Sequence, residues 1–119
     1  MTTVRAVFIN ARKTRDVAAG ETIFREGDEG DYMYGVVSGA VELRIGDHTV
    51  EVAGEGDVFG EMALIDKSKR AATATATAPT SLAMIDQREF LFLVHETPTF
   101  AIQVMSSLAD RLRKLDSAL

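Results

Sequence analysis

Residues 60–73 read Gly60-Glu61-Met62-Ala63-Leu64-Ile65-Asp66-Lys67-Ser68-Lys69-Arg70-Ala71-Ala72-Thr73. A carboxylate, Glu61, opens a predicted short helical turn, and a guanidinium, Arg70, follows nine positions later. At the start of such a turn the N–H groups of Met62 and Ala63 lack intrahelical partners, which favours an anion there. Arg70 adds a planar fork that matches phosphate oxygens. Because Glu61 would repel that anion unless it turned toward a hydroxyl donor, these groups suit a ligand with one phosphate and one free hydroxyl.

The length and composition predict one soluble domain. A chain of 119 residues is enough for a single domain, residues 1–119, with one core. It is 46% hydrophobic and 26% charged, as soluble globular proteins are. The net charge of −5 argues against binding to nucleic acid through the overall field. No stretch approaches the roughly twenty apolar residues of a membrane span, so we expect a cytoplasmic protein with no membrane contact.

Neither a metal centre nor a catalytic site is expected. The chain has no cysteine, which excludes disulfides and thiolate ligands. His48 and His95 are too far apart in the sequence to suggest a cupin-like metal site. No Ser-His-acid set or Walker-type loop is present, and Gly54-x-Gly56 lacks the βαβ context of a dinucleotide fingerprint. We therefore expect no enzyme activity and no cofactor.

The middle of the chain, from Val17 to Asp86, has a β pattern. Short apolar stretches are separated by glycine-and-acid turns every eight to twelve residues, which indicates a sandwich or barrel. Val41, Leu43 and Ile45 alternate with polar residues, and Val50 and Val52 alternate with Glu51, as in half-buried strands. The predicted strands are Thr22–Arg25, Tyr32–Ser38, Ala40–Ile45, His48–Ala53, Ala71–Ala78 and Ser81–Ile85.

Two further features of this region bear on the site. Ala71–Ala78 alternates Ala with Thr at the strand period of two, so small alanines would face inward and leave room for a ligand or fill a narrow barrel. Gly27 and Gly30 are interpreted as serving turn geometry and nothing more.

The last third is predicted to be helical. Asp86 would cap a helix over Gln87–Val94, and a second helix would start at Pro98 and run to Ala118. Its apolar residues recur at steps of three and four, which is typical of a helix–helix seam. That stripe would form a homodimer interface or fold back on its own domain; it comprises Met105, Leu108, Leu112, Leu115 and Leu119. The periodicity of Val4–Ile9 is compatible with a helix or a strand.

Phe59-Gly60-Glu61-Met62-Ala63-Leu64 followed by Arg70-Ala71-Ala72-Thr73 resembles the phosphate-binding cassette of cyclic nucleotide-binding domains, found in catabolite activators, cAMP-dependent kinase regulatory subunits and gated channels. The resemblance includes Gly27-Asp28-Glu29-Gly30-Asp31, Tyr34, Gly39-Ala40-Val41, Gly54-Glu55-Gly56-Asp57 and Leu108-Ala109-Asp110-Arg111-Leu112. It implies a mainly β fold: an eight-stranded, jelly-roll-like barrel over about 16–86, a short N-terminal helix, and C-terminal helices over about 87–118 against which that helix packs.

The resemblance also implies roles for the site residues. Glu61 would accept the ribose 2′-hydroxyl and Arg70 would hold an exocyclic phosphate oxygen, while the N–H groups of Ala63 and Ala71 complete the cradle. Gly60 and Met62 would shape the turn, and Ala72 belongs to the same cassette. Ala71 stands where cGMP-selective relatives often carry Thr, which favours cAMP over cGMP. The base would contact Leu43, Val50, Ala53 and Arg111.

The sequence therefore predicts a cyclic nucleotide sensor that signals through its C-terminal helices to an effector protein or a further domain. One alternative is a ligand-independent interaction or dimerisation module of the same fold. Another is that Glu61 and Arg70 form an internal ion pair that only holds the loop.

Overall fold

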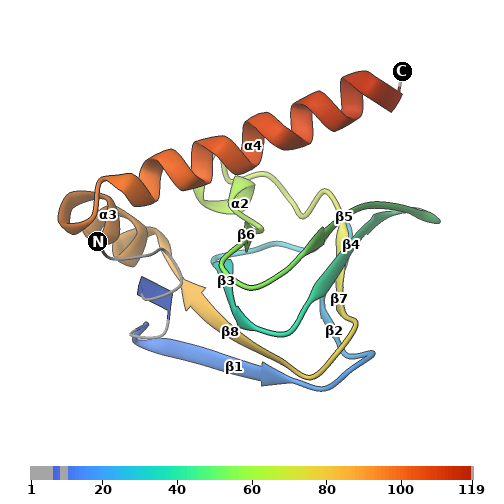
Figure 1. Ribbon diagram of the computed structural model, residues 1–119, viewed down its shortest axis with the longest axis horizontal. Helices are drawn as coiled ribbons and strands as arrows, with labels where there is room; N and C mark the ends of the chain where they lie inside the picture. Colours follow the sequence, from blue (N-terminus) through green and yellow to red (C-terminus); the bar gives the residue numbers. More distant parts are fainter. Residues whose placement is uncertain (1–6, 9–10, 119) are drawn as a thin grey trace.

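Two four-stranded antiparallel sheets form the body of the molecule in the computed structural model, which describes residues 7–8 and 11–118 (Figure 1). The first sheet has the order β1 (Lys13–Val17), β8 (Thr80–Ile85), β3 (Met33–Ser38) and β6 (Val58–Phe59). The second has the order β2 (Thr22–Phe24), β7 (Thr73–Ala76), β4 (Val41–Ile45) and β5 (His48–Ala53). The helices are α2 (Met62–Ile65), α3 (Gln87–Glu96) and α4 (Thr99–Ala118). The predicted eight-stranded, mainly β fold with flanking helices is confirmed.

Six strands lie where the sequence pattern predicts them, but β1 and β6 were not predicted. β1 has the sequence Lys-Thr-Arg-Asp-Val and leaves most of its side chains exposed, so it carries no apolar periodicity. It forms by pairing with β8, from Lys13 opposite Met84 to Val17 opposite Thr80. β6 has two residues and is too short for any period to register. Both strands depend on partners far away in the sequence.

The prediction that buried and exposed residues alternate along the β4–β5 hairpin is partly wrong. Val41 and Leu43 are buried as predicted, but Ile45 is 43% exposed near the turn. In β5 the predicted faces are not observed: Val52 is 56% exposed, whereas the Glu51 side chain is only 12% exposed. The register of the two strands shifts between Leu43 and Arg44, which breaks the simple alternation between the two halves of the hairpin.

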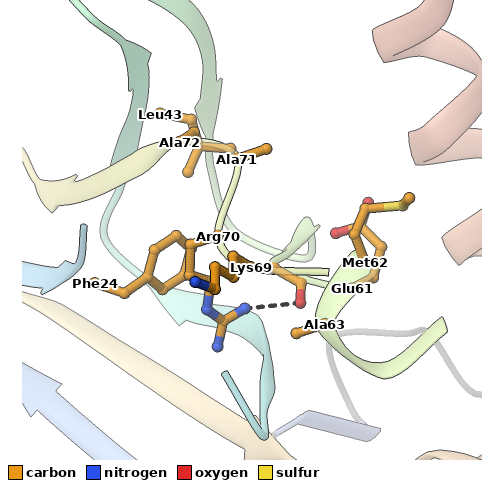
Figure 2. Close-up of a pocket in the computed structure, with 10 residues that line it drawn as sticks. Phe24, Leu43, Glu61, Met62, Ala63, Lys69, Arg70, Ala71 and Ala72 are labelled. Carbon is orange, nitrogen blue, oxygen red and sulfur yellow. Dashed lines mark hydrogen bonds between the residues drawn. The ribbon is translucent and has the colours of Figure 1, made fainter. Parts of the chain in front are cut away.

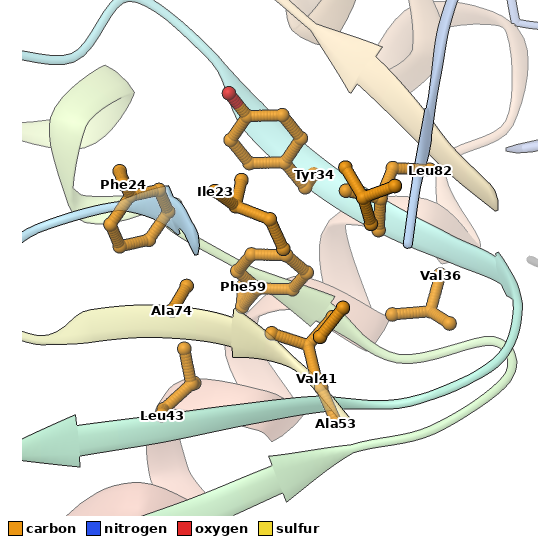
Figure 3. Close-up of a cluster of buried hydrophobic side chains, with 12 residues drawn as sticks. Ile23, Phe24, Tyr34, Val36, Val41, Leu43, Ala53, Phe59, Ala74 and Leu82 are labelled. Atoms are coloured by element: carbon orange, nitrogen blue, oxygen red, sulfur yellow. The ribbon is translucent and has the colours of Figure 1, made fainter. Parts of the chain in front are cut away.

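The main hydrophobic core lies between the two sheets (Figure 3). Tyr34 and Phe59 stack at its centre with ring centroids 5.3 Å apart. Ala74 and Ala76 on β7 are fully buried, so the alanines of the Ala/Thr repeat do face inward. Both belong to this core, where small side chains suit a narrow space between the sheets.

A second core joins the outer face of the first sheet to the helices. Phe8 is fully buried there and meets Phe100 of α4 edge-on, with centroids 6.2 Å apart. Gly35 on β3 makes room for Phe8, since a Cβ at this position would lie 2.6 Å from the ring. Residues 7 and 8 are helical. Residues 4–6 and 9, which the prediction also places in this segment, lie outside the described residues.

The C-terminal helices follow the prediction closely. Asp86 caps α3 by accepting a hydrogen bond from the N–H of Glu89 at 2.8 Å. α4 begins at Thr99, directly after Pro98, and runs along one end of the sandwich (Figure 1). No helix among the described residues combines the length and apolar character needed to cross a membrane.

The apolar stripe of α4 does not form one continuous face. Leu108 packs against the second core, whereas Met105 and Leu112 are 55% and 64% exposed. Leu115 and Leu119 lie outside the described side chains. Among the described side chains of α4, the large apolar ones that are exposed are Ile102, Met105 and Leu112.

Candidate functional site

A cavity lies between α2, the segment leading into β7 and the end of the second sheet (Figure 2). It contains about 390 Å³ of empty space, part of it open to solvent. Its lining residues are Phe24, Leu43, Gly60, Glu61, Met62, Ala63, Lys69, Arg70, Ala71 and Ala72. The structure therefore brings together all seven cassette residues singled out in the sequence.

The four residues expected around a base are distributed differently. Leu43 lines the cavity, but Val50 and Ala53 pack in or against the core between the sheets. Arg111 reaches from α4 to Glu61.

Arg70 is a buried cation held by backbone carbonyls. Arg70 is only 7% exposed. Nη1 donates to the carbonyl of Gly60 at 2.9 Å, shown dashed in Figure 2, and Nη2 donates to the carbonyl of Tyr32 at 2.6 Å. The guanidinium carbon lies 4.1 Å from the Phe24 ring centroid, in cation–π range. Burial lowers the pKa of Arg70, but arginine starts so far above neutrality that the group stays charged.

The surrounding loops leave space for this guanidinium. The N–H of Arg70 donates to the carbonyl of Asp28, and its carbonyl accepts from the N–H of Gly27, both at 2.8 Å. A Cβ on Gly30 would lie 2.4 Å from Cζ of Arg70, and a Cβ on Gly60 would lie 2.7 Å from Nη1. A Cβ added at Gly27 would meet nothing within 4 Å, and its φ of +86° agrees with the predicted role in a turn. For Gly30 the turn-only interpretation is wrong, because its missing side chain admits Arg70.

Glu61 is a buried carboxylate at the start of α2. It is 1% exposed and occupies the N-cap position, yet its side chain makes no capping bond. It turns instead toward α4, where Nη1 of Arg111 donates to Oε1. Burial raises the pKa of Glu61, and the nearby Arg111 opposes that rise. α2 has only four residues, so its dipole is a weak attractor of anions and the positive charge at the cavity comes from Arg70.

Arg111 ties three parts of the molecule together. Its Nε donates to Oε2 of Glu51 on β5, its Nη1 to Glu61, and its Nη2 to the carbonyl of Val58 at 2.7 Å. Within the described part of the chain the structure records no ion pair between Glu61 and Arg70. The alternative that these two residues pair with each other to hold the loop is therefore wrong.

Each of the two buried charges keeps one unused polar atom. Among the residues that the structure describes, three buried side-chain atoms lack a hydrogen-bond partner: Oε2 of Glu61, Nε of Arg70 and, away from the cavity, Nε of Arg44. Each buried polar atom without a partner lowers the free energy of unfolding by roughly 1–3 kcal/mol, so native structures seldom keep one without a reason. Glu61 and Arg70 line the same cavity, which makes a polar ligand the simplest reason.

Sequence reasoning missed several residues of the site. Phe24 and Gly30 lie 46 and 40 positions from Arg70 in the sequence, and Glu51 lies 10 positions from Glu61, so only the tertiary fold brings them close. Lys69 lines the cavity next to Arg70, and its place within residues 60–73 could have marked it as a site residue.

Over residues 7–8 and 11–118, no three His, Cys, Asp or Glu side chains gather closely enough to hold a metal ion.

The fold and the cavity define a class: a small two-sheet β domain that buries a carboxylate and a guanidinium beside one cavity. Comparison with known proteins narrows this class. The family model described as "Cyclic nucleotide-binding domain" matches residues 14–97. The chain belongs to the cyclic nucleotide-binding domain family, and by family it is a regulatory domain for a cyclic nucleotide.

Three relatives illustrate the likeness. The cyclic AMP receptor protein of Thermus thermophilus is 37% identical over 82% of this chain and 47% of its own length. The crystal structure of the catabolite activator protein of T. thermophilus has a TM-score of 0.76 at 35% identity, over 89% of this chain and 52% of that one. The cAMP-dependent protein kinase regulatory subunit of Eremothecium gossypii is 40% identical over 72% of this chain and 19% of its own length. The chain thus spans about half or less of these relatives.

Proposed function

We propose that the cavity binds a 3′,5′-cyclic nucleotide without altering it, prefers cAMP to cGMP, and transmits its occupancy through α3 and α4. One observation carries the proposal: a buried carboxylate and a buried guanidinium line the same cavity, and each keeps one polar atom without a partner among the described residues. A cyclic nucleotide offers one monoanionic phosphate and one free ribose hydroxyl, which match the two groups in number and in charge.

The phosphate is assigned to Arg70. Its Nη atoms are partly occupied by carbonyl oxygens, while Nε is free to donate to an exocyclic phosphate oxygen. Ala63 and Ala71 line the same cavity, and their N–H groups would complete the cradle, with Gly60 and Met62 shaping its turn and Ala72 continuing its wall. Hydrogen bonds to charged groups are among the stronger ones, about 1.5–3 kcal/mol each, so Arg70 should dominate the affinity.

The ribose is assigned to Glu61. Because Oε1 is held by Arg111, Oε2 remains to accept the 2′-hydroxyl. A 2′-deoxy nucleotide would leave Oε2 buried and unpaired, at a cost of about 1–3 kcal/mol.

The preference for cAMP rests on Ala71. Its methyl group lines the cavity and offers no hydrogen bond to a guanine amino group. Leu43 supplies an apolar wall for a purine, with Val50 and Ala53 behind it and Arg111 at the α4 side. The T. thermophilus relative is named for cyclic AMP, which agrees with this assignment.

Calorimetry with cAMP and cGMP tests the proposal on the wild type, Arg70→Lys and the matched control Arg25→Lys, an exposed arginine close to the same wall. We expect cAMP to bind more tightly than cGMP, and Arg70→Lys to weaken cAMP about 10- to 100-fold, since lysine lacks the planar fork. Arg25→Lys should bind like the wild type. No heat from either nucleotide at millimolar concentration overturns the proposal, and equal binding by Arg70→Lys would show that the phosphate is held elsewhere.

A second role concerns the exposed side of α4. Ile102, Met105 and Leu112 present apolar side chains to solvent on this helix, which favours an interaction surface such as a homodimer seam. Light scattering with and without cAMP tests it, and a mass that stays monomeric in both conditions rules the dimer out. The output that the domain controls would lie in a partner protein or in a further domain.

A further inference from the structure

The Arg111 guanidinium has two carboxylate partners, and only one of them belongs to the cavity. Glu61 lines the cavity, whereas Glu51 lies on β5 outside the lining. The Glu51 side chain is 12% exposed and that of Arg111 is 23% exposed, so their contact is largely shielded from solvent. An ion pair in such surroundings is screened less than one on the open surface.

The second half of α4 has few other ties to the barrel. Among its described side chains after Val104, none is buried. Leu108 packs partly against the second core, and Arg111 makes the polar contacts to β5, to Glu61 and to the carbonyl of Val58. The position of this half of the helix against the barrel therefore depends strongly on Arg111.

We propose that Glu51 is a positioning residue that fixes Arg111, and with it the second half of α4, against the barrel before any ligand binds. Two carboxylates share one guanidinium, so Glu61 can give part of its hydrogen-bonding capacity to a ligand while Glu51 keeps Arg111 in place. This last consequence rests on the proposed function, whereas the anchoring of α4 does not. Ligand entry would then leave this contact between α4 and the barrel in place.

Hydrogen exchange of the ligand-free protein tests the anchoring. The informative variant is Glu51→Gln, which keeps the side-chain length but removes the charge. The matched control is Asp47→Asn, the same change at the exposed turn of the same hairpin. We expect Glu51→Gln to speed exchange in residues 105–114 about tenfold, the factor for one lost charge-assisted hydrogen bond, with the sheets unchanged. Asp47→Asn should leave both regions unchanged.

A double-variant comparison adds a readout that a general loss of stability would not produce. If Glu51 acts through Arg111, Glu51→Gln combined with Arg111→Gln should exchange no faster in residues 105–114 than Arg111→Gln alone. Unchanged exchange in Glu51→Gln, an equal rise in α4 and in the sheets, or additive effects of the two substitutions would each overturn the inference.

Adding cAMP separates this inference from the proposed function. If the wild type binds no nucleotide but Glu51→Gln still loosens α4, the proposed function fails and the anchoring by Glu51 stands. If the wild type binds cAMP but Glu51→Gln leaves α4 protected, the anchoring fails and the proposed function stands.

Discussion

Replacing Gly30 with alanine should displace Arg70 without touching any other site residue directly. The backbone of Gly30 lies outside the left-handed region, so alanine can adopt its conformation. Its new Cβ, however, would lie 2.4 Å from Cζ of Arg70, closer than two carbon atoms can approach. The guanidinium must move, because it is the flexible partner of this contact.

The size of the effect follows from what Arg70 would lose. Its bonds to the carbonyls of Gly60 and Tyr32 and its contact with the Phe24 ring all depend on the present position. A displaced guanidinium regains water, so the net loss should be close to one charged hydrogen bond, about 1.5–3 kcal/mol. A Gly-to-Ala change also stabilises by about 0.4–1 kcal/mol through the unfolded chain. The free energy of unfolding should therefore fall by about 1–2 kcal/mol.

The same displacement moves the proposed phosphate donor, so the affinity for cAMP should fall about 10- to 100-fold. Urea denaturation measures the stability and calorimetry the affinity. Gly54→Ala is the matched control, since its Cβ would meet only Oδ2 of Asp57 at 4.0 Å and should leave the affinity unchanged. A Gly30→Ala protein with wild-type stability and affinity would refute this account of how Arg70 is held.

Three further predictions can be checked by urea denaturation. Gly35→Ala should destabilise by about 1–3 kcal/mol, because its Cβ would lie 2.6 Å from the Phe8 ring in the second core; an unchanged midpoint would contradict this packing. Asp86→Ala should cost about 0.5–2 kcal/mol through loss of the α3 cap, and Asp86→Asn, which can still accept from Glu89, should recover most of it. Burial raises the pKa of Glu61 above its ordinary 4.5, so the folded protein holds a proton that the unfolded chain releases as the pH rises through this window. Stability should therefore fall with rising pH there, and the difference between wild type and Glu61→Gln should show that loss; parallel curves would count against a raised pKa.

Local sequence determined most of the elements. Helix caps such as Asp86, the Ala/Thr alternation and the glycine-rich turns act within a few residues, so the pattern predicts α3, α4 and six strands within about two residues of their ends. β1 and β6 were not predicted, because their own residues carry no strand periodicity. Pairing with β8 and β3, respectively, stabilises them as strands. Val52 is exposed and Glu51 is shielded because they pair with Glu42 and Leu43 of β4, a pairing that the alternation within β5 alone does not reveal.

The sequence by itself also singled out Glu61 and Arg70, because they belong to one short stretch that resembles the cassette of the family. Only the tertiary structure decided what each of these charges touches. Arg70 is held by carbonyls of Gly60 and Tyr32 and by the space that Gly30 leaves, and Glu61 faces Arg111 from α4. The physical reason is the distance along the chain over which each feature is determined. A cap or a turn depends on residues a few positions away. The partners of a buried charge are set by the packing of strands and helices that are far apart in the sequence.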